Sequence, residues 1–181
     1  MRVVEKAQLM SATEIDRTLQ RLAHEIVERT SELDCLVLVG IRRRGVPLAQ
    51  RLARNIQAIL GRPVPVGSLD ITLYRDDLST VAPQPVVQAG DIPEVNDRDI
   101  VLVDDVLYTG RTTRAAMNGL FDLGRPRRVL LCVLIDRGHR ELPIEARFIG
   151  RDVQTRPSEI IEVRLEEIDH EERVMLVDRV S

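Results

Sequence analysis

The chain has little of three things: aromatic rings, lysine and long apolar runs. It contains no tryptophan, two tyrosines and two phenylalanines among 181 residues, so base stacking on aromatic rings cannot dominate any recognition of RNA. No apolar run approaches the ~20 residues that span a bilayer, and residues 1–6 do not form the apolar core of a signal peptide. We therefore expect a cytoplasmic protein without a membrane partner.

Cysteine is also scarce. Cys35 and Cys132 stand inside apolar runs, and two cysteines are too few for a disulfide framework, so we expect buried, reduced thiols. Lys6 is the only lysine among the 26 lysine and arginine residues. Base composition or a warm habitat is the simpler explanation of that bias, although arginine also forms planar, bidentate contacts with phosphate that lysine cannot. Because the net charge is −3, local arginine clusters such as Arg42–Arg44 carry more information than the total.

Strand and helix patterns alternate along the chain, which predicts one α/β domain over residues 1–181 with a central, mostly parallel sheet. A capping box at Ser11–Glu14 precedes a helix whose apolar stripe runs from Ile15 to Val27. Two more helices are expected over residues 45–60 and up to about Leu123. The expected strands cover residues 36–39, 64–73, 100–103, 129–135, 146–149, 160–163 and 174–177. Residues 76–93 have little periodicity and are expected to form a long loop, of the kind that often covers a site.

The segment Asp104–Thr113 is the most informative one. The apolar residues Ile100–Val103 before it predict a buried parallel strand, so the two carboxylates stand at its carboxyl end, where α/β sheets bind ligands. The hydroxyl residues and glycine of Thr109–Thr113 lead into a helix, whose N-terminus is suited to an anion. Carboxylates can accept hydrogen bonds from vicinal ribose hydroxyls, and the loop can hold a 5′-phosphate. The segment therefore predicts a sugar phosphate as ligand.

Another class of protein also carries adjacent acids at the end of a strand. In the receiver domains of response regulators, the pair comes near the N-terminus and gathers Mg²⁺ together with a third acid. Here the pair comes after about 100 residues and is followed at once by three threonines, a glycine and an arginine. That continuation favours phosphate binding.

The same segment resembles the phosphoribosyl diphosphate (PRPP) signature of type I phosphoribosyltransferases. Three further blocks, at residues 40–45, 69–78 and 136–144, resemble the PyrR family, whose members regulate pyrimidine operons and are also uracil phosphoribosyltransferases. The resemblance extends over residues 5–178. It implies the type I phosphoribosyltransferase fold, with helices flanking the central sheet, a small hood and a flexible loop at approximately residues 72–93 and 136–181.

The resemblance also implies roles for individual residues. Asp104 and Asp105 would hold the ribose hydroxyls, and Arg137 would act with them as a third catalytic residue. Uracil would contact Arg137 and Ile161. Arg43 stands where family members often have a threonine in the diphosphate loop. The residues expected to bind PRPP or nucleotide are Ile41, Arg42, Arg43, Arg75, Asp104, Asp105, Val106, Leu107, Tyr108, Thr109, Gly110, Arg111, Thr112 and Thr113.

Mg²⁺ with PRPP is the implied cofactor, bound mainly through the diphosphate, so no metal ligand is assigned to the protein. The implied partners are PRPP, uracil, UMP or UTP and the leader mRNA of a pyrimidine operon, with no DNA, and the chain is expected to form a homodimer or a higher homo-oligomer. A solvated polar face is the default interpretation of the first helix, but the resemblance implies that this face and its neighbours bind RNA. The residues expected there are Arg17, Gln20, Arg21, His24, Arg29 and Arg151.

The expected function is therefore RNA-binding attenuation of pyrimidine biosynthetic genes in response to uridine nucleotides, together with phosphoribosyl transfer from PRPP to uracil. Two alternatives stay open. One is an RNA-binding nucleotide sensor with negligible catalysis. The other is a phosphoribosyltransferase for another base, such as a 6-oxopurine, although purine enzymes typically have Glu-Asp where this chain has Asp104-Asp105.

Overall fold

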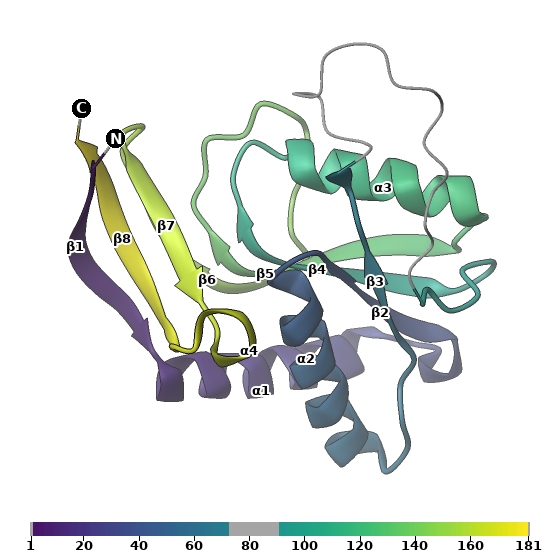
Figure 1. Cartoon of the computed structure of the whole chain (residues 1–181). Helices are drawn as coiled ribbons and strands as arrows, with labels where there is room; N and C mark the ends of the chain where they lie inside the picture. The colour runs from purple at the N-terminus through teal and green to yellow at the C-terminus, as the bar shows by residue number, and fades with distance from the viewer. Residues whose placement is uncertain (1, 73–90, 181) are drawn as a thin grey trace.

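A five-stranded parallel sheet forms the centre of the protein (Figure 1). The computed structural model describes residues 2–72 and 91–180. The strand order is β3-β2-β4-β5-β6, and every neighbouring pair is parallel. The strands are β2 (Leu36–Ile41), β3 (Val66–Leu69), β4 (Asp99–Leu107), β5 (Arg128–Asp136) and β6 (Phe148–Asp152).

Helices cover both faces of this sheet (Figure 1). On one face, α1 (Ala12–Arg29) and α2 (Gly45–Leu60) pack against alternate strand residues such as Leu38 and Val103. On the other face, α3 (Arg111–Leu123) packs against the intervening residues, including Val39 and Leu102. The apolar runs of the strands are therefore explained by burial on both sides. Within residues 2–72 and 91–180, none of the helices combines the length and apolar character required to cross a membrane.

A second, antiparallel sheet lies beside the first and joins the two ends of the chain (Figure 1). It contains β1 (Arg2–Ser11), β8 (Arg173–Val180) and β7 (Glu159–Arg164) in that order. The short α4 (Glu166–Asp169) connects β7 to β8, and a 3-10 turn, η1 (Leu33–Cys35), precedes β2. Residues 136–181, expected in the hood, are divided between the two sheets, because β6 pairs with β5. The N-terminal strand β1 was not predicted from the sequence.

The predicted helices agree closely with the structure. The Ser11 hydroxyl accepts a hydrogen bond from the Glu14 amide at 3.2 Å, which confirms the capping box. The predicted bounds of α2 match, and Gly61 ends it with φ +73°, a left-handed conformation that glycine adopts without strain.

The strand ends differ more. The strand expected over residues 100–103 continues to Leu107 and therefore includes both acids, because β5 pairs with it as far as Asp136. The strand expected over residues 64–73 is reduced to β3, which pairs with the last four residues of β2. The helix expected to follow residues 109–113 already begins within them, at Arg111. Most of the long loop expected over residues 76–93 lies outside the described residues.

A buried carboxylate fixes the beginning of β4 to the beginning of β5. Asp99 is 1% exposed, and it accepts hydrogen bonds from Arg127 Nε at 2.8 Å, Arg127 Nη2 at 2.9 Å and Arg128 Nη2 at 2.9 Å. The hydrogen bonds from Arg127 lower the pKa of Asp99, and Arg128 adds to the effect against the opposing influence of burial. The ionised form is therefore favoured in the folded protein.

We predict that Asp99→Asn lowers the free energy of unfolding by about 1–3 kcal/mol at pH 7. Because the folded protein lowers this pKa, the stabilisation is complete above the ordinary value of about 3.9. It is lost as the pH falls through the lowered value. Urea unfolding at pH 7 and below pH 4 measures the difference. Asp97→Asn is the matched control, since Asp97 is exposed, and it should change stability by less than about 0.5 kcal/mol. Equal effects of the two variants would contradict the assignment.

Candidate functional site

A cavity of about 630 Å³ opens at the carboxyl ends of β2, β3 and β4. Since these strands are parallel, the loops that follow them meet at one edge of the sheet, where α/β folds bind ligands. Its lining combines acids, arginines and hydroxyls from the loops after β2 and β3, from the end of β4 and from the start of α3. The lining residues are Arg42, Arg43, Arg44, Asp70, Ile71, Thr72, Asp104, Asp105, Val106 and Thr112.

The predicted acidic pair lies in this cavity. Asp104 is 8% exposed, and its Oδ1 accepts a hydrogen bond from the Asp105 amide at 2.9 Å. Asp105 in turn accepts one from the Val106 amide at 2.8 Å. Burial raises the pKa of Asp104 well above its ordinary value, and the neighbouring Asp105 charge raises it further. Burial also raises the pKa of Asp105, although hydrogen bonds and the Arg44 charge oppose the shift. Two desolvated carboxylates side by side reduce the stability of the folded protein, and a ligand that supplies hydrogen-bond donors or positive charge would offset this cost.

The start of α3 offers backbone donors next to these acids. Gly110 has φ +92°, which allows the tight turn before the helix. The Thr109 hydroxyl accepts from the Arg111 amide at 3.4 Å, and the Gly110 carbonyl accepts from the Arg114 amide at 3.0 Å. Within residues 2–72 and 91–180, the amides of Thr112 and Thr113 have no acceptor. The first turn of α3 can therefore bind an anionic group.

The loop between β2 and α2 supplies the positive charge. Arg44 is held by α4, because its Nε and Nη2 donate to the Asp169 carboxylate at 3.1 and 2.7 Å. This ion pair lowers the pKa of Asp169. Arg42 and Arg43, which are joined by a cis peptide bond, are exposed and line the cavity. Two guanidinium groups are thus available to a diphosphate on the side of the cavity opposite α3.

The residues after β3 also line the cavity, although the sequence analysis gave them no role in binding a ligand. Asp70 accepts hydrogen bonds from the Thr72 hydroxyl at 2.6 Å and the Thr72 amide at 3.0 Å. These bonds lower the pKa of Asp70, so its carboxylate is held in the charged form. The signal that could have identified Asp70, Ile71 and Thr72 is their position, because they follow the carboxyl end of a parallel strand.

Several predicted nucleotide-binding residues contribute to the core or lie beside the cavity. The side chains of Ile41 and Leu107 pack in the core next to α3, and Thr113 is also buried. Only the backbone amides and carbonyls of these residues can therefore contact a ligand in the cavity. Arg111 pairs with Glu141 at 2.9 Å. Arg75 lies outside the described residues.

The predicted base-binding residues are not among those that line the cavity. Arg137 follows β5, is 6% exposed, and its Cζ lies 3.9 Å from the centre of the Tyr108 ring. Its Nη2 donates to the Glu159 carbonyl at 2.7 Å and its Nε to the Thr155 hydroxyl at 3.2 Å. Burial lowers the pKa of this guanidinium. Ile161 lies on β7 in the core between the two sheets.

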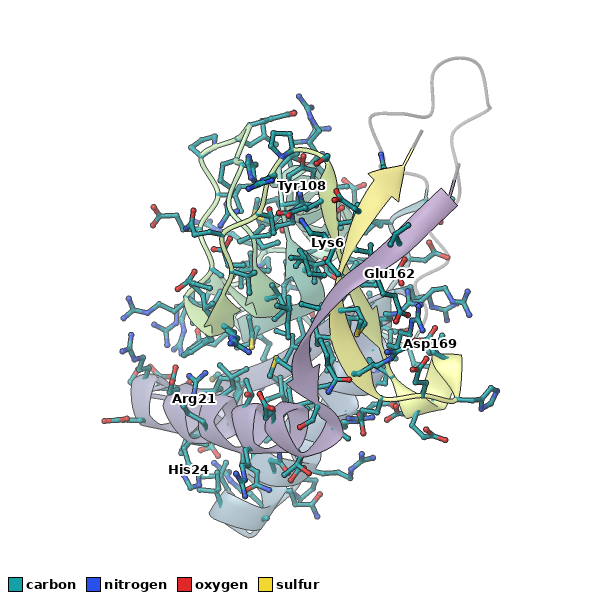
Figure 2. The ribbon with its side chains drawn as sticks, turned by 90° about the vertical axis from the view of Figure 1, so that its left-hand side faces the viewer. Lys6, Arg21, His24, Tyr108, Glu162 and Asp169 are labelled. Atoms are coloured by element: carbon teal, nitrogen blue, oxygen red, sulfur yellow. The ribbon has the colours of Figure 1, made fainter. Side chains whose placement is uncertain are left out.

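The residues predicted to bind RNA gather around α1, away from the cavity. Figure 2 shows Arg21 and His24 on α1 at the opposite end of the molecule from Tyr108. Arg21 is already engaged, because it pairs with Glu25 at 2.6 Å and donates to the Gly150 carbonyl at 2.5 Å. Arg151 donates to the Leu9 carbonyl.

Four more members of the set are exposed on α1. Arg17 and Arg29 project from the helix surface, and Gln20 donates to Asp16 at 2.8 Å. Gln20 and His24 line a second, shallower cavity of about 320 Å³ together with α2 residues. The surface therefore combines exposed basic side chains with a hollow between two helices.

Comparison with known proteins identifies the family. A model described as "Phosphoribosyl transferase domain" matches residues 7–168. The protein "Bifunctional protein PyrR" of Pelotomaculum thermopropionicum is 59% identical over 175 residues, which cover 96% of this chain and 97% of that protein. The proteins of the same name from Thermus thermophilus and Deinococcus radiodurans are 57% and 51% identical. Each alignment covers 96% of this chain, and they cover 97% and 95% of those proteins, respectively.

Solved structures agree on the fold. A hypoxanthine-guanine phosphoribosyltransferase from Bacillus anthracis superposes with a TM-score of 0.72 at 17% identity, over 98% of this chain and 100% of that one. The hypoxanthine phosphoribosyltransferase of Trypanosoma cruzi gives 0.71 at 16% identity, with 98% of each chain covered. These similarities confirm the predicted type I phosphoribosyltransferase fold. Together with the full-length relatives, they show that the chain belongs to the PyrR family of phosphoribosyl transferase domain proteins.

Proposed function

We propose that this chain transfers the phosphoribosyl group of PRPP to uracil, giving UMP and diphosphate. We propose also that it binds the leader RNA of pyrimidine genes in response to uridine nucleotides. The word "bifunctional" in the names of its full-length relatives supports two activities in one chain. The observation that carries the catalytic half is the Asp104–Asp105 pair, a buried and a half-buried carboxylate that lie between a cationic loop and a helix N-terminus.

The proposed substrate fits these three parts in one orientation. The 5′-phosphate accepts hydrogen bonds from the free amides of Thr112 and Thr113, and the ribose hydroxyls donate to Asp104 and Asp105. Arg42 and Arg43 then face the diphosphate on C1. Among the described residues, the amides of Thr112 and Thr113 have no acceptor in the free protein. Each carboxylate of the acidic pair accepts one backbone hydrogen bond and can accept more from the ribose.

Phosphoribosyl transfer requires that the positive charge developing on the ribose be stabilised. As the C1–O bond to diphosphate breaks, the ribose becomes oxocarbenium-like. A uracil nitrogen forms the new bond to C1, and its proton is released to an oxygen of the departing diphosphate. The two carboxylates stabilise this developing charge, because they are fixed by backbone hydrogen bonds and need no reorganisation. The arginines hold the diphosphate as it leaves.

Magnesium fits this arrangement as a cation shared with the substrate. The described residues contain no group of three or more histidine, cysteine or acidic side chains that could hold a metal by themselves. The two acids of the cavity, Asp104 and Asp105, provide oxygen ligands of the kind that Mg²⁺ accepts alongside phosphate oxygens and water. When bound, Mg²⁺ would neutralise charge on the diphosphate.

The surroundings of Arg137 support uracil as the base. Two edges of its guanidinium are occupied by Glu159 and Thr155, while Nη1 has no partner in the described part of the chain. A donor held beside the Tyr108 ring suits a flat base that carries carbonyl acceptors, as uracil does on two of its ring carbons.

Nucleotide in the cavity can influence the α1 surface only by favouring one state of the protein. A short chain of covalent and hydrogen bonds connects Arg137, the proposed uracil contact, to α1. β5 ends at Asp136, directly before Arg137, and it pairs with β6, whose Gly150 carbonyl accepts from Arg21 on α1. We therefore propose that uridine nucleotide in the catalytic cavity strengthens binding of RNA at α1.

We predict that Asp104→Asn and Asp105→Asn each reduce phosphoribosyl transfer by a factor on the order of 100–1000, since fixed charge at the reacting ribose is removed. Transfer of labelled uracil with PRPP and Mg²⁺ measures this. Hypoxanthine in place of uracil tests the alternative base. Asp152→Asn, at the exposed end of β6, is the control and should keep full activity. Wild-type turnover in both acid variants would contradict the proposed role.

We predict that the same Asp104→Asn variant is more stable than the wild type at neutral pH. The folded state raises the pKa of this aspartate, so it binds the proton more tightly than the unfolded state does, and wild-type stability falls as the pH rises through the raised value. Asparagine does not titrate. The melting temperature should rise by about 2–4 °C for each kcal/mol regained, and the gain should shrink towards pH 4. An unchanged or lower melting temperature at pH 7 would be inconsistent with a desolvated carboxylate.

We predict that Arg17→Ala with His24→Ala weakens leader RNA binding roughly tenfold, equivalent to about 1.4 kcal/mol, and leaves uracil transfer unchanged. Each lost phosphate contact should also reduce the slope of log affinity against log salt by about 1. Filter binding over a salt series measures both. Arg125→Ala removes an exposed arginine beyond α3 and is the control. If it weakens binding as much, RNA binding at α1 is wrong.

We predict that UMP tightens leader RNA binding in the wild type and not in Asp104→Asn with Asp105→Asn, because the acids hold the ribose. Gel-shift titration at several UMP concentrations measures this coupling. An RNA affinity that UMP leaves unaltered in the wild type would contradict nucleotide sensing through the cavity.

A further inference from the structure

The only lysine of the chain occupies a distinctive position. Lys6 is the extra residue at a register shift between β1 and β8, where Glu5 and Ala7 pair with consecutive residues of β8. Such a bulge changes the direction in which a side chain is presented. Lys6 Nζ lies 2.5 Å from Glu159 Oε1 and 3.5 Å from Asp178 Oδ2. One ammonium group thus connects all three strands of the antiparallel sheet.

Glu159 connects this ion pair to Arg137. Its side chain is 7% exposed, and its carboxylate also accepts a hydrogen bond from the Arg156 amide at 2.7 Å. The Glu159 amide donates to the Arg156 carbonyl at 3.0 Å, which closes the turn before β7. The Glu159 carbonyl accepts from Arg137 Nη2 at 2.7 Å. The same residue therefore holds Lys6 through its side chain and Arg137 through its backbone.

Two further contacts fix the position of Arg137 beside Glu159. Thr155, in the same turn, accepts from Arg137 Nε at 3.2 Å and donates to the Arg137 carbonyl at 3.4 Å. Tyr108, from the loop before α3, covers the guanidinium. Figure 2 shows Lys6 and Tyr108 in the same upper part of the molecule. The position of Arg137 thus depends on a turn that the Lys6–Glu159 pair anchors.

We propose that Lys6 and Glu159 are positioning residues that set the placement of Arg137 for the base. This inference rests on the proposed function, in which Arg137 meets uracil. Neither residue lines the cavity that holds the acids and the arginine loop. Loss of the ion pair should therefore weaken the binding of uracil and leave the binding of PRPP unchanged. If the pair only stabilised the sheet, its loss would not affect one substrate more than the other.

The hydrogen bond with Glu159 raises the pKa of Lys6, and the same bond lowers the pKa of Glu159. Both groups are therefore charged across the neutral range. The Lys6–Glu159 ion pair therefore persists across this range, and we expect its effect on KM for uracil to be constant between pH 6 and pH 8.

The test compares four variants. Lys6→Met and Glu159→Gln each remove one charge of the pair. Glutamine keeps the length of the glutamate side chain, and methionine keeps that of lysine as far as Cε. Lys6→Arg keeps the charge. Arg164→Met is the matched control, because it removes the ion pairs of Arg164 with Glu162, Glu171 and Glu5 at the other end of the same β7 strand. For each variant, KM is measured separately for uracil and for PRPP, together with kcat and the melting temperature.

Lys6→Met and Glu159→Gln should raise KM for uracil on the order of tenfold, since displacing a positioned group even slightly has effects of this size. KM for PRPP should stay at the wild-type value, and Lys6→Arg should restore most of the uracil affinity. The inference is overturned if KM for uracil is unchanged in Lys6→Met, if both KM values rise together, or if Arg164→Met raises KM for uracil equally.

A second measurement keeps the two proposals distinguishable. Because the chain has one lysine, labelling with ¹³Cε-lysine gives a single side-chain signal. We expect saturating uracil with diphosphate, or UMP, to shift this signal in the wild type and not in Arg137→Ala. A wild-type protein that transfers no uracil contradicts the proposed function, whereas a lysine signal that the nucleotide leaves unmoved contradicts the positioning role.

Discussion

Two adjacent carboxylates at the end of a strand, one buried and one half-buried, are the constraint on which the site depends. Asp104 and Asp105 lose most of their hydration, and burial raises both pKa values. The surrounding structure offsets only part of this cost, through backbone hydrogen bonds and the Arg44 charge. A region of a protein that is unfavourable by itself and becomes favourable with a ligand is typical of functional sites. The remaining parts of the cavity, namely the arginine loop and the start of α3, supply the groups that such a ligand needs.

The parallel sheet explains how residues from distant parts of the chain reach one cavity. β2, β3 and β4 end at the same edge, so the loops after Ile41, Leu69 and Leu107 converge. The antiparallel sheet contributes differently. It pairs the first and last strands of the chain, and its strand β7 begins at Glu159, whose carbonyl accepts a hydrogen bond from Arg137. Helix α1 lies on the far side, where it contacts β6 through Arg21. The proposed catalytic and RNA-binding surfaces are therefore separate but connected through β5 and β6.

Much of this arrangement could be predicted from the sequence, and the failures have physical reasons. Helices were predicted well, because capping by Ser11 and termination at Gly61 are local. The end of β4 was not, because pairing with β5 extends the strand through the acids. β1 was missed since its residues are mostly exposed and its partner β8 lies at the other end of the chain. The engagement of Arg21 and the stacking of Arg137 on Tyr108 depend on tertiary contacts that no spacing in the sequence records.

The structure of the protein with UMP bound tests the central claim most directly. We expect ribose hydroxyls within hydrogen-bonding distance of both the Asp104 and Asp105 carboxylates. We also expect the 5′-phosphate on the amides at the start of α3, beside Thr112. A crystal saturated with UMP in which this cavity is empty, or in which the nucleotide lies elsewhere on the protein, would contradict the claim.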